Sequence, residues 1–344
     1  STVLMPFGGK TQQTETQVSV QKLPTDGVTN TASIMAYGYN PFIAEWSPYH
    51  GAAYAVVEAC SKVVAAGADY SRMRFSYQEY FERMTHDPHT FGKPLSALLG
   101  ALKMQVALGL PSIGGKDSMS GTFEHINVPP TLIAFGITTV KADKVISPEF
   151  KQAGNRLYLV KHTPLANYMP NTDQLQANWR AVTEGIQSGR IVSAYAIGFG
   201  GVAEAIAKMS FGNQLAANIT LSENELFAYN YGSILVEETL SNSPLKGENQ
   251  KSPFKGDLEG LYIGEVMEGD DLIINGERIS REALLKANTA PFERIYPATT
   301  EQGPTPSLPT REGDGELPSS IDANLTPSLC REGRGGSATP VGYI

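Results

Sequence analysis

Residues 95–121 read LSALLGALKMQVALGLPSIGGKDSMSG, and this stretch decides the fold class. Apolar residues at helical spacing predict a helix over residues 95–110, which ends before Pro111. A short strand and a glycine turn at Gly114–Gly115 follow. An apolar run rich in β-forming residues, PPTLIAFGITTV, then covers residues 129–140. A helix that alternates with strands in this way predicts an α/β protein.

The same alternation continues on both sides of this stretch. Upstream, GAAYAVVEACSKVVAAGAD (51–69) places small apolar residues at helical spacing and predicts a buried helix that ends at Gly67. Downstream, NRLYLVK (155–161) starts a new strand after a polar stretch with Pro and Gly, so we place a domain boundary near residue 153. Further elements are expected at QLQANWRAVTEGIQSG (174–189, helix), IVSAYAIG (191–198, strand), VAEAIAKMSF (202–211, helix), GSILVEETL (232–240, strand), LYIGEV (261–266, strand) and DLIINGERIS (271–280, strand).

Composition divides the chain into two folded domains and three segments of other kinds. We expect a lead-in arm over residues 1–30, in which QVSVQKL forms one strand, and domains over residues 31–152 and 153–297. The SPLKGE and SPFKGD repeat makes residues 241–259 a low-complexity insertion in the second domain. The repeats TPSLPTREG and TPSLCREG make residues 298–344 a low-complexity linker.

Charge and cysteine content exclude several classes of protein. The 344 residues include 27 Lys and Arg against 35 Asp and Glu, and a net charge of −8 argues against a general nucleic-acid binder. Two cysteines, Cys60 and Cys330, support neither a disulfide framework nor a four-ligand zinc site. We find no apolar stretch long enough to span a bilayer and no secretory leader, so we expect a cytoplasmic protein without a membrane partner. The missing initiator Met and the low-complexity end suggest a segment of a longer protein.

The segment GGKDSMSG (114–121) is the sharpest candidate for a binding site. Glycines after a strand let backbone N–H groups approach an anion, and lysine and serine side chains add donors. The alternative is a common glycine turn that binds nothing. The candidate residues for binding phosphate are Gly114, Gly115, Lys116, Asp117, Ser118 and Ser120.

Two further patterns point to an anion or a cation site. Glu58 and Lys62 lie four residues apart on one face of a predicted helix, either as an ordinary ion pair or in a cleft where Glu58 holds a cation and Lys62 meets phosphate. His50 faces the same cleft or caps the helix. Gly200 and Gly201 start another predicted helix, whose N-terminus is a natural anion platform.

Three other motifs give weaker evidence for a functional site. PFGGKT (6–11) lacks the first glycine and the preceding strand of a phosphate-binding P-loop. His86 and His89 flank Asp87–Pro88 in a predicted loop with no further metal ligands in register. No strand-Gly-x-Ser-x-Gly elbow surrounds the serines of GGKDSMSG, so an acyl-transfer triad is not expected.

In order along the chain, the motifs SPYHGAAYAVVEA, GLPSIGGKDSMSG, PPTLIAFG and GFGGVAEAIAKMSF resemble the synthetase part of phosphoribosylformylglycinamidine synthase, in the second of its two repeated halves. The resemblance covers about residues 28–297. It implies an aminoimidazole ribonucleotide synthetase-like α/β fold, with an N-terminal dimerisation-type domain and a larger C-terminal α/β domain that bind nucleotide between them. It also implies a carbon–nitrogen ligase of purine biosynthesis, which uses ATP and glutamine to convert formylglycinamide ribonucleotide to formylglycinamidine ribonucleotide.

The resemblance also implies partners and missing parts. The first synthetase half and a glutaminase domain would belong to the same full-length chain, and the catalytic cleft draws on that first half, so no catalytic residue is assigned here. Neither cysteine suits the glutaminase nucleophile. We therefore expect a fragment that is inactive alone and that self-associates through the apolar sheet face left open by the missing half.

Departures from the family concern the metal ligands of an auxiliary ATP or ADP site. Relatives carry Glu-x-x-x-Asn where this chain has Glu58 and Lys62, and an acidic strand where it reads Tyr195 to Phe199. The TASIMAYG segment has no carboxylate either. Only Glu58 remains as a magnesium ligand, so we do not expect this half to bind Mg-ADP as relatives do; Lys62 would replace the lost cation. The alternatives are a scaffold half without catalysis and another synthetase of the same fold, which the KDSMS string argues against.

Overall fold

The structure, a computed structural model, describes residues 1–239, 260–293 and 295–296. Residues Ser1–Lys286 form one compact unit, and a second unit begins at Ala287, inside helix α7 (Arg281–Glu293). The whole predicted insertion 241–259 and the whole predicted linker 298–344 lie outside the described residues. The description below concerns the first unit.

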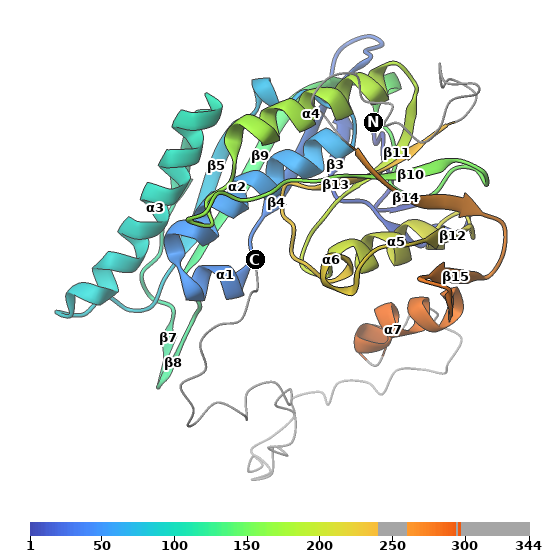
Figure 1. Ribbon diagram of the computed structural model, residues 1–344. Helices are drawn as coiled ribbons and strands as arrows, with labels where there is room; N and C mark the ends of the chain where they lie inside the picture. Colours follow the sequence, from blue (N-terminus) through green and yellow to red (C-terminus); the bar gives the residue numbers. More distant parts are fainter. Residues whose placement is uncertain (240–259, 294, 297–344) are drawn as a thin grey trace, which may run out of the picture. The chain divides into compact units, whose positions relative to one another are not determined.

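A five-stranded sheet occupies the N-terminal part of the chain (Figure 1). Its strand order is β3-β4-β9-β5-β6, with antiparallel neighbours except for the parallel pair β5 and β6. Its strands are β3 (Ser19–Lys22), β4 (Thr31–Gly38), β5 (Arg74–Tyr80), β6 (Ser112–Lys116) and β9 (Thr131–Lys141). Helices α1 (Pro41–Trp46), α2 (Pro48–Ala65) and α3 (Pro88–Leu108) follow or separate these strands.

Helix α2 is buried on nearly all sides because it lies between two sheets. Ser47 caps its start by accepting the N–H of His50, and Pro48 occupies the first turn, where its missing N–H is not needed. Small residues dominate its sequence, which lets it pack closely against β4 and β9 on one side and β11 on the other. Gly67, with φ +101°, ends it as the sequence predicts.

A seven-stranded sheet occupies the C-terminal part of the unit, in the order β11-β13-β10-β14-β12-β15-β16. Its neighbours are antiparallel except for β12 and β15. The strands are β10 (Arg156–Val160), β11 (Ile191–Ala196), β12 (Ala216–Ile219), β13 (Ile234–Glu238), β14 (Gly260–Met267), β15 (Asp271–Ile274) and β16 (Glu277–Ser280). The helices are α4 (Thr172–Gln187), α5 (Gly201–Phe211) and the single turn α6 (Glu223–Leu226).

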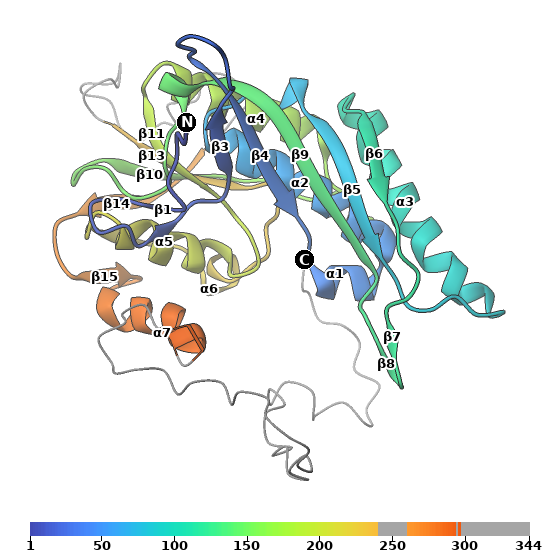
Figure 2. The same cartoon turned by 180° about the vertical axis from the view of Figure 1, so that it is seen from behind.

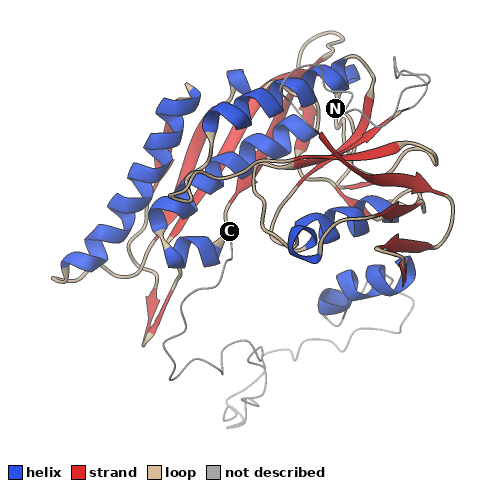
Figure 3. Ribbon diagram, viewed as in Figure 1, coloured by secondary structure: helices blue, strands red, loops and turns tan. Residues whose placement is uncertain are grey.

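These elements form four layers, as Figure 3 shows: the five-stranded sheet, helices α2 to α4, the seven-stranded sheet and helices α5 and α6. One apolar core lies between the two sheets around α2 and α4, with Trp179 fully buried. A second core lies under α5. The outer face of the five-stranded sheet has no helix over it among the described residues (Figure 2). Large apolar side chains remain exposed there, from Met35, Tyr37, Phe135 and Ile137.

Short elements complete the described chain. The N-terminal arm forms the hairpin of β1 (Phe7–Gly8) and β2 (Thr14–Glu15) before β3, so the strand expected in QVSVQKL is confirmed. A second small hairpin pairs β7 (Thr122–Phe123) with β8 (Ile126–Asn127), and two 3-10 turns cover Tyr70–Arg72 and Ala142–Lys144. No helix in the described ranges is both long and apolar enough to cross a membrane.

Several details differ from the sequence prediction. Helix α3 begins at Pro88 rather than residue 95, because Asp87 caps it by accepting the N–H of His89. His89 therefore lies in a helix and not in a loop. The pair Gly114–Gly115 lies inside strand β6 and not in a turn after it. The run DLIINGERIS (271–280), expected as one strand, forms the antiparallel pair β15 and β16, because Asn275 and Gly276 adopt positive φ and turn the chain. The sequence patterns also left β4, β5, β12, α1 and α7 unassigned.

Candidate functional site

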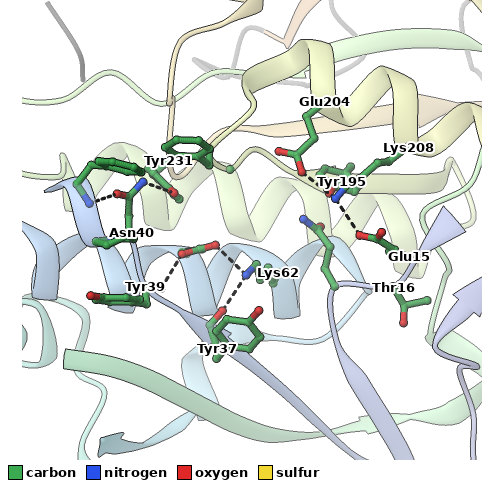
Figure 4. Close-up of a pocket in the computed structure, with 16 residues that line it drawn as sticks. Glu15, Thr16, Tyr37, Tyr39, Asn40, Lys62, Tyr195, Glu204, Lys208 and Tyr231 are labelled. Carbon is green, nitrogen blue, oxygen red and sulfur yellow. Dashed lines mark hydrogen bonds and ion pairs between the residues drawn. The ribbon is translucent and has the colours of Figure 1, made fainter. Parts of the chain in front are cut away.

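A cavity of about 460 Å³ lies where the N-terminal arm, α1, α2, β11 and α5 meet (Figure 4). Six aromatic side chains and five charged ones line it together with polar residues and Gly198. The lining residues are Glu15, Thr16, Gln17, Tyr37, Tyr39, Asn40, Pro41, Phe42, Glu58, Lys62, Tyr195, Gly198, Phe199, Glu204, Lys208 and Tyr231. We call this space the aromatic pocket. Of the residues predicted from the sequence, it contains Glu58 and Lys62.

Glu58 and Lys62 form an ion pair on the wall of the aromatic pocket. The Lys62 Nζ lies 2.8 Å from Glu58 Oε1, and both side chains are almost fully buried, with exposures of 12% and 11%. The same ammonium group donates to the carbonyl oxygen of Tyr37 at 2.9 Å and lies 4.5 Å from the centre of the Tyr37 ring. Glu58 Oε2 accepts the N–H of Tyr39 at 2.9 Å. The pair therefore fastens the end of β4 to α2.

Gly38 permits this close approach of β4 to α2. A Cβ atom at Gly38 would lie 2.1 Å from the carbonyl oxygen of Ala55 and 2.9 Å from the Cβ of Glu58. Only a residue without a side chain fits between the strand and the helix backbone. The resulting geometry brings the Tyr37 carbonyl and the Tyr39 N–H within reach of the helix side chains.

A second ion-pair network closes the opposite wall. Lys208 Nζ on α5 lies 2.8 Å from Glu15 Oε2 and 2.9 Å from Glu204 Oε1. Glu204 Oε2 accepts the N–H of Gly200 at 2.9 Å. Burial lowers the pKa of Lys208, but Tyr195, Glu15 and Glu204 outweigh it and raise the pKa above its ordinary value. The sequence predicts that the start of α5 binds an external anion, but the N–H of its N-cap residue Gly200 is taken by a carboxylate of the helix itself.

Gly201 and the residues before it fix the start of α5. Gly201 has φ +66°, and a Cβ there would lie 2.5 Å from the carbonyl oxygen of Leu226. Gly198 and Phe199 line the pocket, whereas Gly200 and Gly201 do not. A phosphate role for Gly200 and Gly201 stays a prediction.

The N-terminal arm is bound to the wall of the pocket by specific hydrogen bonds. The amide of Gln17 donates to the carbonyl oxygen of Ala196 at 2.9 Å and accepts the Ala196 N–H at 2.8 Å, so it pairs with β11 as a further strand would. The hydroxyl of Thr14 donates to the carbonyl oxygen of Lys208 at 2.6 Å and accepts the N–H of Gly212 at 2.8 Å. Glu15 is therefore held at a fixed place on the pocket wall.

Two further polar side chains of the pocket, Asn40 and Tyr231, are hydrogen-bonded to each other. Asn40 caps α1 by accepting the N–H groups of Phe42 and Ile43, and its amide donates to the Tyr231 hydroxyl at 2.9 Å. Burial and the nearby charge of Glu58 raise the pKa of Tyr231, so the phenol stays neutral. At the rim, the rings of Phe42 and Phe199 stack 5.3 Å apart.

The charges of the pocket do not favour a polyanion. The lining holds three carboxylates, from Glu15, Glu58 and Glu204, against the two ammonium groups of Lys62 and Lys208, which leaves one excess negative charge. Both ammonium groups are already paired. The pocket also does not suit magnesium: both oxygens of Glu58 are engaged, and the described residues contain no group of three potential metal ligands.

The GGKDSMSG segment lies elsewhere, on the edge strand β6. All five residues of β6 are exposed, and the described residues include no ion-pair partner for Lys116. A Cβ at Gly115 would lie 2.6 Å from the carbonyl oxygen of Tyr77, so this glycine serves the pairing with β5, whereas Gly114 faces open space. The hydroxyl groups of Ser118 and Ser120 lie 3.0 Å apart. This segment does not line the aromatic pocket, so the predicted phosphate-binding residues form two separate groups.

Sequence reasoning missed one titratable group beside this segment. Strands β5 and β6 pair up to Gln78 and Lys116, so Glu79 and Asp117 follow as neighbours. Glu79 is only 5% exposed. Burial, and then the negative charge of Asp117, raise the pKa of Glu79 to about 7. The alternation of buried residues in RFSYQEY (74–80) was the available signal, because it places Glu79 on the inward face with Phe75 and Tyr77.

Two other predicted residues have structural roles. His50 Nδ1 lies 2.8 Å from the hydroxyl of Ser47, and its Nε2 lies 3.0 Å from the carbonyl oxygen of Asn167, so the ring belongs to the capping of α2 and does not line the pocket. Cys60 is fully buried in α2, and burial raises the pKa of its thiol, which keeps it protonated and unreactive. Cys330 lies outside the described residues.

Comparisons with known proteins identify the fold. No family model matches the chain. The chain is 26% identical over 311 residues to phosphoribosylformylglycinamidine synthase subunit PurL of Thermoplasma volcanium. The aligned region covers 80% of this chain and 38% of that PurL. The structure of PurLQS from Thermotoga maritima matches with a TM-score of 0.63 and 16% identity over 82% of this chain and 50% of that one.

Two further structures match over similar lengths. The T. maritima PurL complexed with ATP has a TM-score of 0.58 and 16% identity over 77% of this chain and 47% of that one. Thiamine monophosphate kinase (ThiL) from Aquifex aeolicus has a TM-score of 0.50 and 14% identity over 73% of this chain and 91% of that one.

These matches confirm the expected fold class. PurL and ThiL share one α/β fold, of the aminoimidazole ribonucleotide synthetase type, with an N-terminal and a C-terminal domain. The domain boundaries near residues 30, 153 and 297 stay predictions. The chain spans half or less of the length of the PurL proteins it matches. It therefore has the fold of these ATP-dependent synthetases and is a distant relative of PurL.

Proposed function

We propose that the chain is one half of a PurL-type ligase, which acts in the cytoplasm and converts formylglycinamide ribonucleotide to formylglycinamidine ribonucleotide in purine biosynthesis. Its distant relationship to PurL and its span of half or less of those proteins support this role. The observation that carries the proposal is that residues 114–117 of the GGKDSMSG segment are exposed at the end of an edge strand, where a second half can complete a site.

The reaction requires donors of the kind this segment offers. The amide oxygen of the substrate attacks the γ-phosphorus of ATP and ADP leaves; ammonia derived from glutamine then adds to the carbon of the iminophosphate, and phosphate leaves with the former amide oxygen. Both steps develop negative charge on phosphoryl oxygens, which a cation and backbone N–H groups stabilise. Lys116 is a cation without an ion-pair partner in the described chain, and Gly114 leaves room for a phosphoryl group. Asp117, Ser118 and Ser120 complete the proposed phosphate-binding group.

The exposed face of the five-stranded sheet is where we expect the partner half to bind. The outer face of the five-stranded sheet exposes Met35, Tyr37, Phe135 and Ile137, whose side chains we expect to pack against the first synthetase half. A glutaminase domain would supply ammonia. In the isolated chain, a second copy would take the place of the missing half and form a homodimer.

Within this enzyme, the aromatic pocket supports a scaffold role better than a role in holding an auxiliary nucleotide. Its two ammonium groups and the N–H of Gly200 are satisfied by carboxylates of the chain itself. ATP and ADP would then be bound at the seam with the other half. Lys62, Gly200 and Gly201 would contribute to structure and not to nucleotide binding.

Co-expression with the complementary synthetase half from the same source tests this function. We expect a stable complex that forms formylglycinamidine ribonucleotide from ATP, ammonia and the amide substrate, and no turnover by the chain alone. In the complex, Lys116→Ala should lower kcat/KM by about 100-fold, because it removes a charge-assisted contact to phosphate. Lys103→Ala, at an exposed lysine of α3, is the matched control and should retain activity.

Two results would contradict the proposal. If the two halves do not associate, the chain is not half of such a synthetase. If the complex is active and Lys116→Ala behaves like Lys103→Ala, the phosphate role of the GGKDSMSG segment is wrong.

A further inference from the structure

The aromatic pocket carries a second inference, which does not depend on the reaction proposed above. The surroundings of Lys62 are those of a bound cation. A carboxylate oxygen of Glu58 and the carbonyl oxygen of Tyr37 lie at 2.8 and 2.9 Å, and the face of the Tyr37 ring lies 4.5 Å away. Oxygen ligands and an aromatic face are what proteins use to hold cations. Here the cation is covalently part of the chain.

The surroundings of Glu204 are those of a bound anion. Its carboxylate receives the N–H of Gly200 at the start of α5 and the ammonium of Lys208. A helix N-terminus combined with a lysine is a common arrangement for binding phosphate. Glu15, held by the N-terminal arm, supplies a second carboxylate to Lys208. The anion position is therefore also filled by the chain.

We propose that Lys62, Lys208 and Glu204 are built-in replacements for the metal ions and the phosphate of a metal–nucleotide complex, so that the pocket is held together without either ligand. The fold family implies such a complex between the two domains, and the residues present do not fit one. The ion pairs of Lys62 and Lys208 join β4 to α2 and the N-terminal arm to α5. In this proposal, a bound metal–nucleotide complex would otherwise make these connections.

A further property of the pocket agrees with this replacement. With both lysines paired, the lining keeps one excess negative charge, which opposes entry of a nucleotide polyphosphate. Magnesium would have to displace Lys62 from Glu58, since the other carboxylate oxygen is bound to the N–H of Tyr39. The pocket thus excludes metal and phosphate by occupation and not by a lack of space.

Chemical rescue tests the proposal. Lys62→Ala removes the ammonium group and opens room beside Glu58, whereas Lys62→Met removes the charge and fills the room. Melting temperatures of both variants and the unmodified chain are measured with EDTA, MgCl₂, propylammonium chloride or Mg-ADP, at constant ionic strength. Lys93→Ala is the matched control, because Lys93 pairs with Glu82, whose side chain is 10% exposed, compared with 11% for Glu58.

The unmodified chain should melt at the same temperature, within roughly 1 °C, under all four conditions. Lys62→Ala should melt several degrees lower in EDTA and regain at least half of the loss with magnesium or propylammonium. Lys62→Met should show the loss without the recovery, and Lys93→Ala should respond no more to cations than the unmodified chain does.

Three results would overturn the proposal. The first is a rise of roughly 3 °C or more with Mg-ADP that persists in Lys116→Ala, since a ligand bound in the pocket would stabilise the folded state without the GGKDSMSG segment. The second is recovery of Lys62→Met or Lys93→Ala to the same extent as Lys62→Ala. The third applies if Lys62→Ala does not fold: isothermal titration of Lys116→Ala with Mg-ADP should show no heat of binding, and saturable binding would refute the proposal.

Discussion

Glu79, near the end of β5, is the neighbour of Asp117, which directly follows β6, and the charge of Asp117 acts on the Glu79 carboxyl. Strand pairing fixes this relationship, because Gln78 and Lys116 are the last paired residues before them. Burial and the charge of Asp117 together raise the pKa of Glu79 to about 7, so its carboxyl is partly protonated near neutral pH. The phosphate-binding segment proposed here therefore borders a group that exchanges its proton in the physiological range.

Glu79 should make stability decrease as pH rises. A glutamate in the unfolded chain has its pKa near 4.5, so between that value and about 7 the folded state binds more protons than the unfolded state. The free energy of unfolding therefore falls with rising pH across this range. Glu79→Gln should remove this part of the slope and stabilise the chain at pH 8 by about 1 kcal/mol, after allowance for solvent screening. Urea denaturation at pH 5, 6, 7 and 8 measures the effect.

The comparison must be between variant and unmodified chain at each pH, because burial also raises the pKa of Glu238, to about 6. Asp117→Asn should reduce the slope less than Glu79→Gln, since burial is the larger cause of the shift. An unchanged slope in Glu79→Gln would show that Glu79 ionises normally in the folded chain.

The open face of the five-stranded sheet should cause self-association. Phe135 and Ile137 point outward from β9 and are 37% and 39% exposed, which leaves apolar surface that a second copy can bury. Light scattering after size-exclusion chromatography should give a dimer whose fraction rises with concentration. Ile137→Asp should give a folded monomer.

Val28→Asp is the control for this experiment, because Val28 is fully exposed in the loop between β3 and β4 and not on a strand of the sheet. It should leave the dimer intact. A monomeric unmodified chain at high concentration, or a dimer that survives Ile137→Asp, would show that this face is not the contact.

Trp179 should contribute more to the free energy of unfolding than Trp46, the other tryptophan of the chain. It is fully buried between the sheets, its Nε1 donates to the Ser61 hydroxyl of α2 at 3.2 Å, and its ring lies 4.9 Å from that of Tyr70. Trp179→Ala should cost about 3–5 kcal/mol, since it leaves a large cavity. Trp46→Ala, at a half-exposed site, should cost less than about 1.5 kcal/mol. Urea midpoints that shift equally would contradict this assignment of the core.

Long elements with a clear period could be predicted from the sequence, and central strands of small or polar residues could not. The spacing of apolar residues and the glycine at its end predict helix α2. Strand β4 alternates too, but its inward residues include Ala32 and Ala36, which give little hydrophobic contrast. Strand β5 carries Glu79 on its inward face, which breaks the pattern that a buried strand normally shows.

In the candidate site, too, local sequence spacing predicts some contacts and cannot predict others. Four-residue spacing predicts that Glu58 and Lys62 share one helix face, and they do. The partners of Lys208 could not be found in this way, because Glu15 is 193 residues away and only the fold of the N-terminal arm brings it to α5. Likewise, the glycine pair 114–115 suggests a turn until the pairing with β5 places it inside a strand.

Gly38, between the pocket residues Tyr37 and Tyr39, should be highly sensitive to substitution. A methyl group there would lie 2.1 Å from the backbone oxygen of Ala55, and backbone of a buried helix cannot move aside cheaply. Gly38→Ala should therefore push β4 away from α2, separate the Tyr37 carbonyl from Lys62 and lower stability by about 2–3 kcal/mol. Gly92→Ala is the control: nothing lies within 4 Å of a Cβ there, and alanine favours the helix. Urea denaturation should show a loss for Gly38→Ala and no loss for Gly92→Ala. If Gly38→Ala were as stable as the unmodified chain, β4 would not lie as close to α2 as described. The carbonyl oxygen of Tyr37 would then not lie within reach of Lys62.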